Sequence, residues 1–258
     1  MAREQHSSLA QLPKLALLQR SVKINVAQKQ HPSRRRKQPR KFEYSTKLGE
    51  PVTKLKPATS AATVRTRRAY FDFKFGQLHV RTAFPTTGGF GEQVTLFCLH
   101  PARSSSRIFA RFLPEIADVR SVYAPDLPGC GESDPAPNAS VAAAADAISD
   151  LANDLRLRQI DVLGISDGAA VALELAAARN DIVRRVVVVG VPGVERLPRV
   201  MQQSVVMLSG RGPEQARHSI KAAVPNARFV DVADHAEDSF EANPKNLAAQ
   251  IGAFLTGP

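Results

Sequence analysis

The sequence predicts an α/β domain whose mostly parallel sheet of eight strands is covered by helices on both faces. Two observations support this prediction. Short apolar runs alternate with helical segments of about 10–15 residues, and strands joined by such crossovers pair in parallel. In addition, residues 160–177 form an apolar run, a G-x-S-x-G turn and an Ala-rich helical segment without interruption. A turn of this kind between strand and helix is typical of a catalytic α/β sheet.

The predicted elements follow one another at short intervals. The first two strands alternate apolar and polar residues on either side of Gly76-Gln77, so we expect an antiparallel hairpin. The later strands are continuous apolar runs, such as the four valines at 186–189, which is typical of strands buried on both faces. Strands are predicted over residues 70–75, 78–82, 94–99, 119–124, 160–163, 185–190, 205–209 and 228–232. Helices are predicted over residues 105–117, 142–156, 167–179, 214–223 and 244–255.

The positive charge of the chain is confined to its N-terminal quarter. The formal net charge is +11, but residues 1–68 contain 17 Lys and Arg against three acidic residues, and the remaining 190 residues contain 18 against 21. The basicity therefore does not belong to the folded part. We predict a basic, disordered extension over residues 1–66, because this polar, proline-broken segment cannot bury enough apolar surface to fold. Residues 67–258 are predicted to form the folded domain.

Composition also bears on partners and compartment. The extension interleaves few aromatic residues with its basic ones, so any contact with a polyanion would be weak, non-specific and strongly salt-dependent. Cys98 and Cys130 are the only cysteines, which predicts neither a disulfide framework nor a metal site. No apolar run approaches the roughly 18 residues of a membrane span. We expect a cytoplasmic protein, although an Arg-rich, acid-poor N-terminus is also compatible with organellar targeting.

The segment Gly164-Ile165-Ser166-Asp167-Gly168 predicts a nucleophilic serine. A sharp turn from strand to helix holds its central residue in a strained conformation and lifts the hydroxyl of Ser166 clear of the chain. Gly164 and Gly168 stand where a side chain would clash with the neighbouring strand or helix. The alternative interpretation is that the two glycines only make a tight turn.

Three blocks of sequence give residues 69–258 a resemblance to the α/β-hydrolase fold family. They are LHPARSSSRIF at 99–109, YAPDLPGCGESD at 123–134 and the G-x-S-x-G turn itself. The first is similar to the family's His-Gly oxyanion loop, and the second to its P-D-L-P-G-x-G-x-S segment. The likeness is greatest to the branch of small esterases, C–C hydrolases, epoxide hydrolases and dehalogenases, and it weakens after residue 194.

The resemblance implies roles for several residues around the nucleophile. His235, in the loop before the last predicted helix, matches the general base. The backbone N–H groups of Ala102 and Asp167 match the oxyanion hole, which binds the negative charge that develops during acyl transfer. His100 would hold its loop in place rather than perform catalysis. Pro101 replaces the usual glycine of this loop, and it removes one N–H and stiffens the backbone.

Two features depart from the family pattern. The usual acid of the triad, an Asp after the predicted strand 205–209, is missing. Glu214 could serve if the loop is re-spaced, and Glu195, after the preceding strand, is the alternative. The helical cap is essentially absent as well, because only about ten residues, 194–203, lie where the family inserts tens. An open site of this kind offers little exclusion of water and favours exposed or bulky esters.

These features together predict a serine hydrolase that cleaves carboxylic esters or thioesters of small molecules through an acyl-enzyme on Ser166. No metal or organic cofactor is implied. A serine at the nucleophile position disfavours epoxide hydrolase and dehalogenase activities, which use Asp there. Two alternatives are a catalytically decayed hydrolase acting as a binding module, suggested by the missing acid and cap, and a C–C bond hydrolase.

Overall fold

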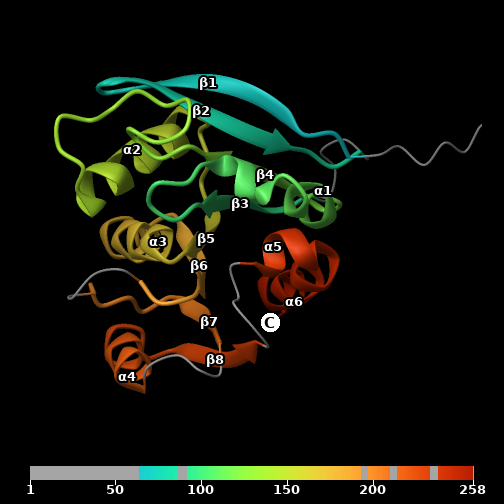
Figure 1. Ribbon diagram of the computed structural model, residues 1–258, viewed down its shortest axis with the longest axis vertical. Helices are drawn as coiled ribbons and strands as arrows, with labels where there is room; N and C mark the ends of the chain where they lie inside the picture. Colours follow the sequence, from blue (N-terminus) through green and yellow to red (C-terminus); the bar gives the residue numbers. More distant parts are fainter. Residues whose placement is uncertain (1–63, 87–91, 193–196, 210–213, 233–237, 258) are drawn as a thin grey trace, which may run out of the picture. The chain divides into compact units, whose positions relative to one another are not determined.

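The computed structural model describes residues 64–86, 92–192, 197–209, 214–232 and 238–257. The predicted basic extension therefore lies outside the described residues, except for residues 64–66. In the described part, eight strands form one sheet in the order β1-β2-β4-β3-β5-β6-β7-β8 (Figure 1). The strands are β1 (Arg67–Phe73), β2 (Gly76–Ala83), β3 (Gln93–Leu99), β4 (Arg120–Pro125), β5 (Ile160–Ile165), β6 (Val183–Val189), β7 (Gln203–Ser209) and β8 (Ala227–Val232).

The pairing confirms the predicted mixture of a hairpin and a parallel sheet. β1 and β2 pair antiparallel, and β2 pairs antiparallel with β4. All the other neighbouring strands are parallel. Because parallel strands end at the same edge of a sheet, the carboxyl ends of β3, β4, β5, β6, β7 and β8 lie on one side. The predicted site residues that the structure describes, His100, Ala102, Ser166, Asp167 and Glu214, follow the ends of three of these strands.

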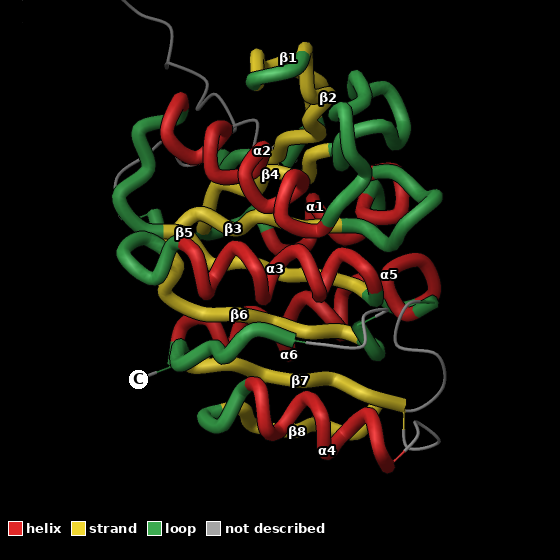
Figure 2. Tube along the Cα trace, turned by 90° about the vertical axis from the view of Figure 1, so that its left-hand side faces the viewer, coloured by secondary structure: helices red, strands yellow, loops and turns green. Residues whose placement is uncertain are grey.

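Helices cover both faces of the sheet, as Figures 1 and 2 show. One face carries α2 (Val141–Asp154), α3 (Asp167–Ala178) and α4 (Glu214–Ala223), and the other carries α1 (Phe112–Ile116), α5 (Ser239–Ala242) and α6 (Pro244–Thr256). Alternate residues of β6 enter the two cores: Val186 and Val188 pack on the α3 side, Val187 and Val189 on the α6 side. The helices in the described segments are all too short or too polar to cross a membrane.

The predicted helix over residues 105–117 is wrong as a single element. The chain forms a short 3-10 helix, Ser106–Phe109, and then restarts as α1 at Phe112. Pro114 explains the break, because proline lacks an N–H and its ring clashes with the carbonyl four residues earlier in a continuous helix. After the restart Pro114 falls in the first turn of α1, where N–H groups have no partner within the helix. The apolar pattern is still satisfied, since Phe109, Phe112 and Leu113 are fully buried.

Candidate active site

Ser166 lies between the end of β5 and the start of α3, in a strained backbone conformation. Its φ is 48° and its ψ is −113°, a region that residues with a side chain rarely adopt. The Ser166 N–H donates to the carbonyl of Val189 over 2.9 Å, and its own carbonyl accepts from the N–H of Ala169, also over 2.9 Å. The neighbouring strand and the helix therefore fix this conformation from both sides, as expected of a turn that presents a nucleophile.

The two glycines of the turn are required by close backbone contacts. A Cβ at Gly164 would lie 2.3 Å from the carbonyl oxygen of Gly168 and 2.5 Å from the Cα of Ala169. A Cβ at Gly168 would lie 2.3 Å from the carbonyl oxygen of Leu99 and 2.5 Å from that of His100. The first glycine thus lets α3 start directly against β5, and the second lets α3 pack against the end of β3.

His100 ties the loop after β3 to the loop after β4. The Leu127 N–H donates to Nε2 of the buried imidazole over 2.9 Å, so the proton of the neutral ring is on Nδ1, which donates to the Pro101 carbonyl over 2.7 Å. Burial lowers the pKa of His100, although the Pro101 carbonyl and Asp126 act in the opposite direction. Its ring is therefore a neutral support for the loop, and its geometry fits the positioning role that the resemblance implies.

The loop after β3 brings Ala102 next to the start of α3. The Pro101 carbonyl accepts from the Ser104 N–H over 3.3 Å, and Arg103 has a φ of 58°, so residues 101–104 form a tight turn. The Ala102 N–H donates to Oδ2 of Asp167 over 3.2 Å. The structure therefore brings together the two residues whose N–H groups were predicted to form an oxyanion hole. It also places a carboxylate there, which the sequence analysis did not consider.

Asp126, at the end of β4, organises the loops on this side of the sheet. Its buried carboxylate accepts from the Ser106 N–H over 2.6 Å, from the Glu132 N–H over 2.9 Å and from Nδ1 of His79 over 2.9 Å. Burial alone would raise the pKa of Asp126, but the hydrogen bonds from Ser106, Glu132 and His79 outweigh it, and the pKa lies below its ordinary value of 3.8. The sequence analysis noted the segment around Asp126 but missed its partner His79 on the distant hairpin.

We expect the substitution Asp126→Asn to destabilise the domain by about 3 kcal/mol at pH 7, because donors face both carboxylate oxygens and an amide has only one oxygen. Its NH2 group would face either the Ser106 N–H or the two donors Glu132 and His79, and leave them without an acceptor. The folded-state pKa of Asp126 is depressed, so its contribution is complete above the unfolded-state pKa, near 4, and is lost as the pH falls through the folded-state value. Urea unfolding should therefore show a difference between the two proteins that narrows below about pH 4. A difference that stayed constant down to pH 3 would contradict this role.

The candidate bases and acids are only partly described. His235 and Glu195 lie in segments 233–237 and 193–196, which are outside the described residues. Glu214 is the exposed first residue of α4, shortly after the end of β7. It thus follows the carboxyl end of a parallel strand, as a triad acid does, and its role remains a proposal. His218, the other histidine that follows Ser166 in the sequence, is exposed on α4.

A short helix that the sequence analysis missed follows the segment that carries His235. Phe240 of α5 is fully buried, with its ring centroid 5.4 Å from that of Phe109 and 5.0 Å from that of Phe112. These aromatic contacts hold α5 beside the 3-10 helix Ser106–Phe109 and α1. A helix of four residues shows too little periodicity to be recognised from sequence, and the isolated Phe240 is its only signal.

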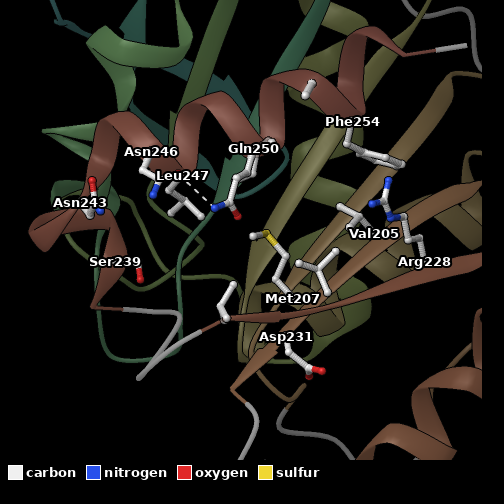
Figure 3. A pocket seen from close by; sticks show the side chains of 14 residues that line it. Val205, Met207, Arg228, Asp231, Ser239, Asn243, Asn246, Leu247, Gln250 and Phe254 are labelled. Atoms are coloured by element: carbon white, nitrogen blue, oxygen red, sulfur yellow. Dashed lines mark hydrogen bonds between the residues drawn. The ribbon is translucent and has the colours of Figure 1, made fainter.

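Two hollows lie beside α5 and α6. An open one of about 870 Å³ separates α5 from residues 104–111 and is lined by Arg107, Arg111 and Glu241 among others. A second, of about 580 Å³, lies between α6 and the strands β7 and β8, with Met207 on its floor and Gln250 at its rim (Figure 3). As far as the chain is described, neither lining includes Ser166. The first hollow borders the predicted oxyanion loop, so it is the better candidate for the path by which a substrate reaches Ser166.

The connection between β6 and β7 is short. β6 ends at Val189 and β7 begins at Gln203, and the described residues between them, 190–192 and 197–202, contain no helix. Val191, just beyond the strand that holds Ser166 in place, is 36% exposed. The region above the turn is therefore not covered by a cap helix from the described part of this connection, in agreement with the predicted minimal cap.

Comparison with known proteins settles the family. The sequence model of the Alpha/beta hydrolase family matches residues 96–257. The chain belongs to the alpha/beta hydrolase family. The match covers the predicted oxyanion loop, the segment around Asp126, the turn at Ser166 and the position of His235. Comparison with functionally curated proteins gives no significant match.

Solved structures of this hydrolase fold resemble the protein closely in architecture and distantly in sequence. A predicted CIB-like hydrolase from Thermoplasma acidophilum superposes with a TM-score of 0.65 at 17% identity, covering 74% of this chain and 98% of its own. Naproxen esterase from Bacillus subtilis gives 0.63 at 17%, covering 75% and 92%. A haloalkane dehalogenase loop variant from Bradyrhizobium elkanii gives 0.61 at 12%, covering 75% and 97%. At such identities the likeness shows the fold and does not select the reaction.

Proposed function

We propose that this alpha/beta hydrolase is a serine hydrolase that cleaves carboxylic esters or thioesters through an acyl-enzyme on Ser166. The observation that carries the proposal is the strained turn at Ser166, held between β5 and α3 by two close-packed glycines. Backbone strain of this kind is retained where a side chain must be presented for chemistry. The esterase among the similar structures is consistent with this activity.

In the proposed mechanism, His235 accepts the hydroxyl proton as Ser166 Oγ attacks the carbonyl carbon, because a neutral serine is a weak nucleophile near pH 7. The N–H groups of Ala102 and Asp167 donate to the oxyanion of the tetrahedral intermediate. When the carbonyl re-forms, the C–O or C–S bond breaks and His235 returns its proton to the leaving group. Water then attacks the acyl-enzyme with His235 as base, which releases the acid and restores Ser166.

The acid that would orient His235 is either Glu214 or Glu195. Glu214 follows β7, which is where the family places its usual Asp, and it begins α4 directly after residues 210–213. Glu195 follows β6. Because removing a triad acid reduces the rate without abolishing it, the two single substitutions Glu214→Gln and Glu195→Gln can be ranked by the loss each causes.

One observation favours a second candidate function, a non-catalytic binding module. The Ala102 N–H, which an oxyanion would need, is already bonded to the Asp167 carboxylate. A carboxylate in this place would oppose the negative charge that develops in acyl transfer. A decayed hydrolase would tolerate such a contact, whereas an active one requires a substrate that can relieve it.

Labelling with a fluorophosphonate distinguishes the two functions. We expect a stoichiometric adduct on Ser166, mapped by intact mass and peptide sequencing, with slower labelling of His235→Ala because an unassisted hydroxyl reacts poorly. Ser219→Ala, which changes an exposed serine of α4, is the matched control and should label normally. A folded protein that gave no adduct would refute the hydrolase proposal and support the binding module.

A further inference from the structure

Asp167 occupies an unusual place for a charged side chain. It is the first residue of α3, directly after the proposed nucleophile, and Oδ2 of its carboxylate accepts from the Ala102 N–H over 3.2 Å. The backbone on both sides of this hydrogen bond is held in place. Gly168, the next residue, packs against the carbonyl oxygens of Leu99 and His100, so the start of α3 is fixed against the loop that carries Ala102.

Among the described residues, no basic side chain forms an ion pair with the carboxylate of Asp167. It lies in the first turn of a twelve-residue helix, where the helix dipole favours negative charge. The side chain is half-buried, which reduces screening by solvent. A carboxylate therefore lies beside the donor that the proposed mechanism needs.

The carboxylate of Asp167 should affect neutral and positively charged substrates differently. The carbonyl oxygen of a neutral ester must displace the carboxylate from the Ala102 N–H and then develop its own negative charge next to it, and the repulsion slows acyl transfer. An ammonium group on the carbon next to the scissile carbonyl changes this balance. Its nitrogen is only three bonds from the carbonyl oxygen, so a substrate whose carbonyl takes the Ala102 N–H brings the ammonium close to the carboxylate that held this N–H. There it would donate charge-assisted hydrogen bonds to the carboxylate and offset its charge while the oxyanion forms.

We propose that Asp167 is a specificity-determining residue that selects esters or thioesters whose acyl group carries a protonated amine next to the scissile carbonyl. This inference rests on the proposed serine hydrolase function and names its substrate class. In it, the carboxylate exchanges its bond with the Ala102 N–H for one with the substrate ammonium, and the freed N–H donates to the oxyanion. The ammonium group of the substrate thus frees the Ala102 N–H, and this N–H then stabilises the oxyanion of the same substrate.

A matched pair of substrates tests the proposal. L-Alanine ethyl ester and ethyl isobutyrate differ only in whether the α carbon carries an ammonium or a methyl group, and at pH 7 most of the alanine amine is protonated. Ethanol release gives kcat/KM for both. We expect the wild-type protein to prefer the alanine ester, and Asp167→Asn, which keeps an oxygen acceptor but removes the charge, to reduce the preference about 10- to 100-fold. The variant should also hydrolyse the isobutyrate ester faster than the wild type.

The control is Asp154→Asn, which removes the same charge from the exposed end of α2 and should leave the preference unchanged. Fluorophosphonate labelling of the same preparations tests the nucleophile independently of the substrate preference. If Ser166 is labelled and Asp167→Asn leaves the substrate preference unchanged, the inference is wrong and the proposed function stands. If Ser166 is not labelled and neither ester is hydrolysed, the proposed function fails and the inference fails with it.

Discussion

The substitution Ser166→Ala should reduce ester hydrolysis about 10⁵-fold, to the residual rate that substrate binding and the proposed oxyanion hole support without a nucleophile. Alanine cannot form the acyl-enzyme, so the second half of the proposed mechanism is lost together with the first. His235→Ala should cause a loss of similar size, because residues that act as one unit cannot substitute for each other. Turnover of L-alanine ethyl ester, measured by ethanol release, gives both values.

The substitution Ser166→Ala should leave the fold intact. The conformation of this residue is held by main-chain hydrogen bonds to Val189 and Ala169, and alanine keeps both of them. Far-UV circular dichroism and urea unfolding should therefore differ little from the wild type, and Ser219→Ala on α4 provides the matched comparison. Wild-type turnover in Ser166→Ala would exclude this serine as the nucleophile.

The substitution Gly168→Ala should destabilise the protein by about 3 kcal/mol or more, since the new methyl group would overlap main-chain atoms that have no space to move into. Its Cβ would lie 2.3 Å from the carbonyl oxygen of Leu99 and 2.5 Å from that of His100. Relief requires α3 to move away from the loop after β3, and this movement would also separate Asp167 from Ala102. We therefore expect urea unfolding at a lower concentration together with slower fluorophosphonate labelling.

Gly252→Ala is the matched control for this substitution. A Cβ at Gly252, inside α6, would meet only Cδ1 of Ile116 at 3.6 Å, an ordinary contact. Alanine should stabilise this helix by roughly 0.5–1 kcal/mol, because glycine is a poor helix former. The two Gly→Ala substitutions are thus expected to have opposite signs, and equal stabilities of the two variants would show that the close approach at Gly168 is not constraining.

The parallel sheet could be predicted because its strands are short apolar runs with buried positions on both faces. The runs around 94–99, 160–165 and 186–189 leave little alternative to central strands. The errors have local physical causes. Pro114 divides a segment whose apolar spacing fits one helix, and α5 is too short to show a period. Boundaries depend on capping and proline geometry, which a hydrophobic pattern does not record.

The candidate site could be predicted in its backbone and not in its side-chain contacts. The turn at Ser166 follows from its two glycines, since only close backbone approach requires them both. The bond between Asp167 and the Ala102 N–H joins residues 65 positions apart, and the one between His79 and Asp126 joins residues 47 apart. No periodicity links such pairs, because tertiary packing alone decides which polar side chains meet.

The hairpin of β1 and β2 has a consequence for how this sequence can change in evolution. The family match begins at residue 96, so the hairpin lies outside it, yet His79 of β2 bonds the carboxylate of Asp126. Tyr70 of β1 packs on the His79 ring, with centroids 5.3 Å apart, and its hydroxyl donates to Glu132 in the same loop. The hairpin and the loop after β4 are therefore expected to co-vary among close homologues, so that a chain that replaces His79 also changes Asp126 or Glu132.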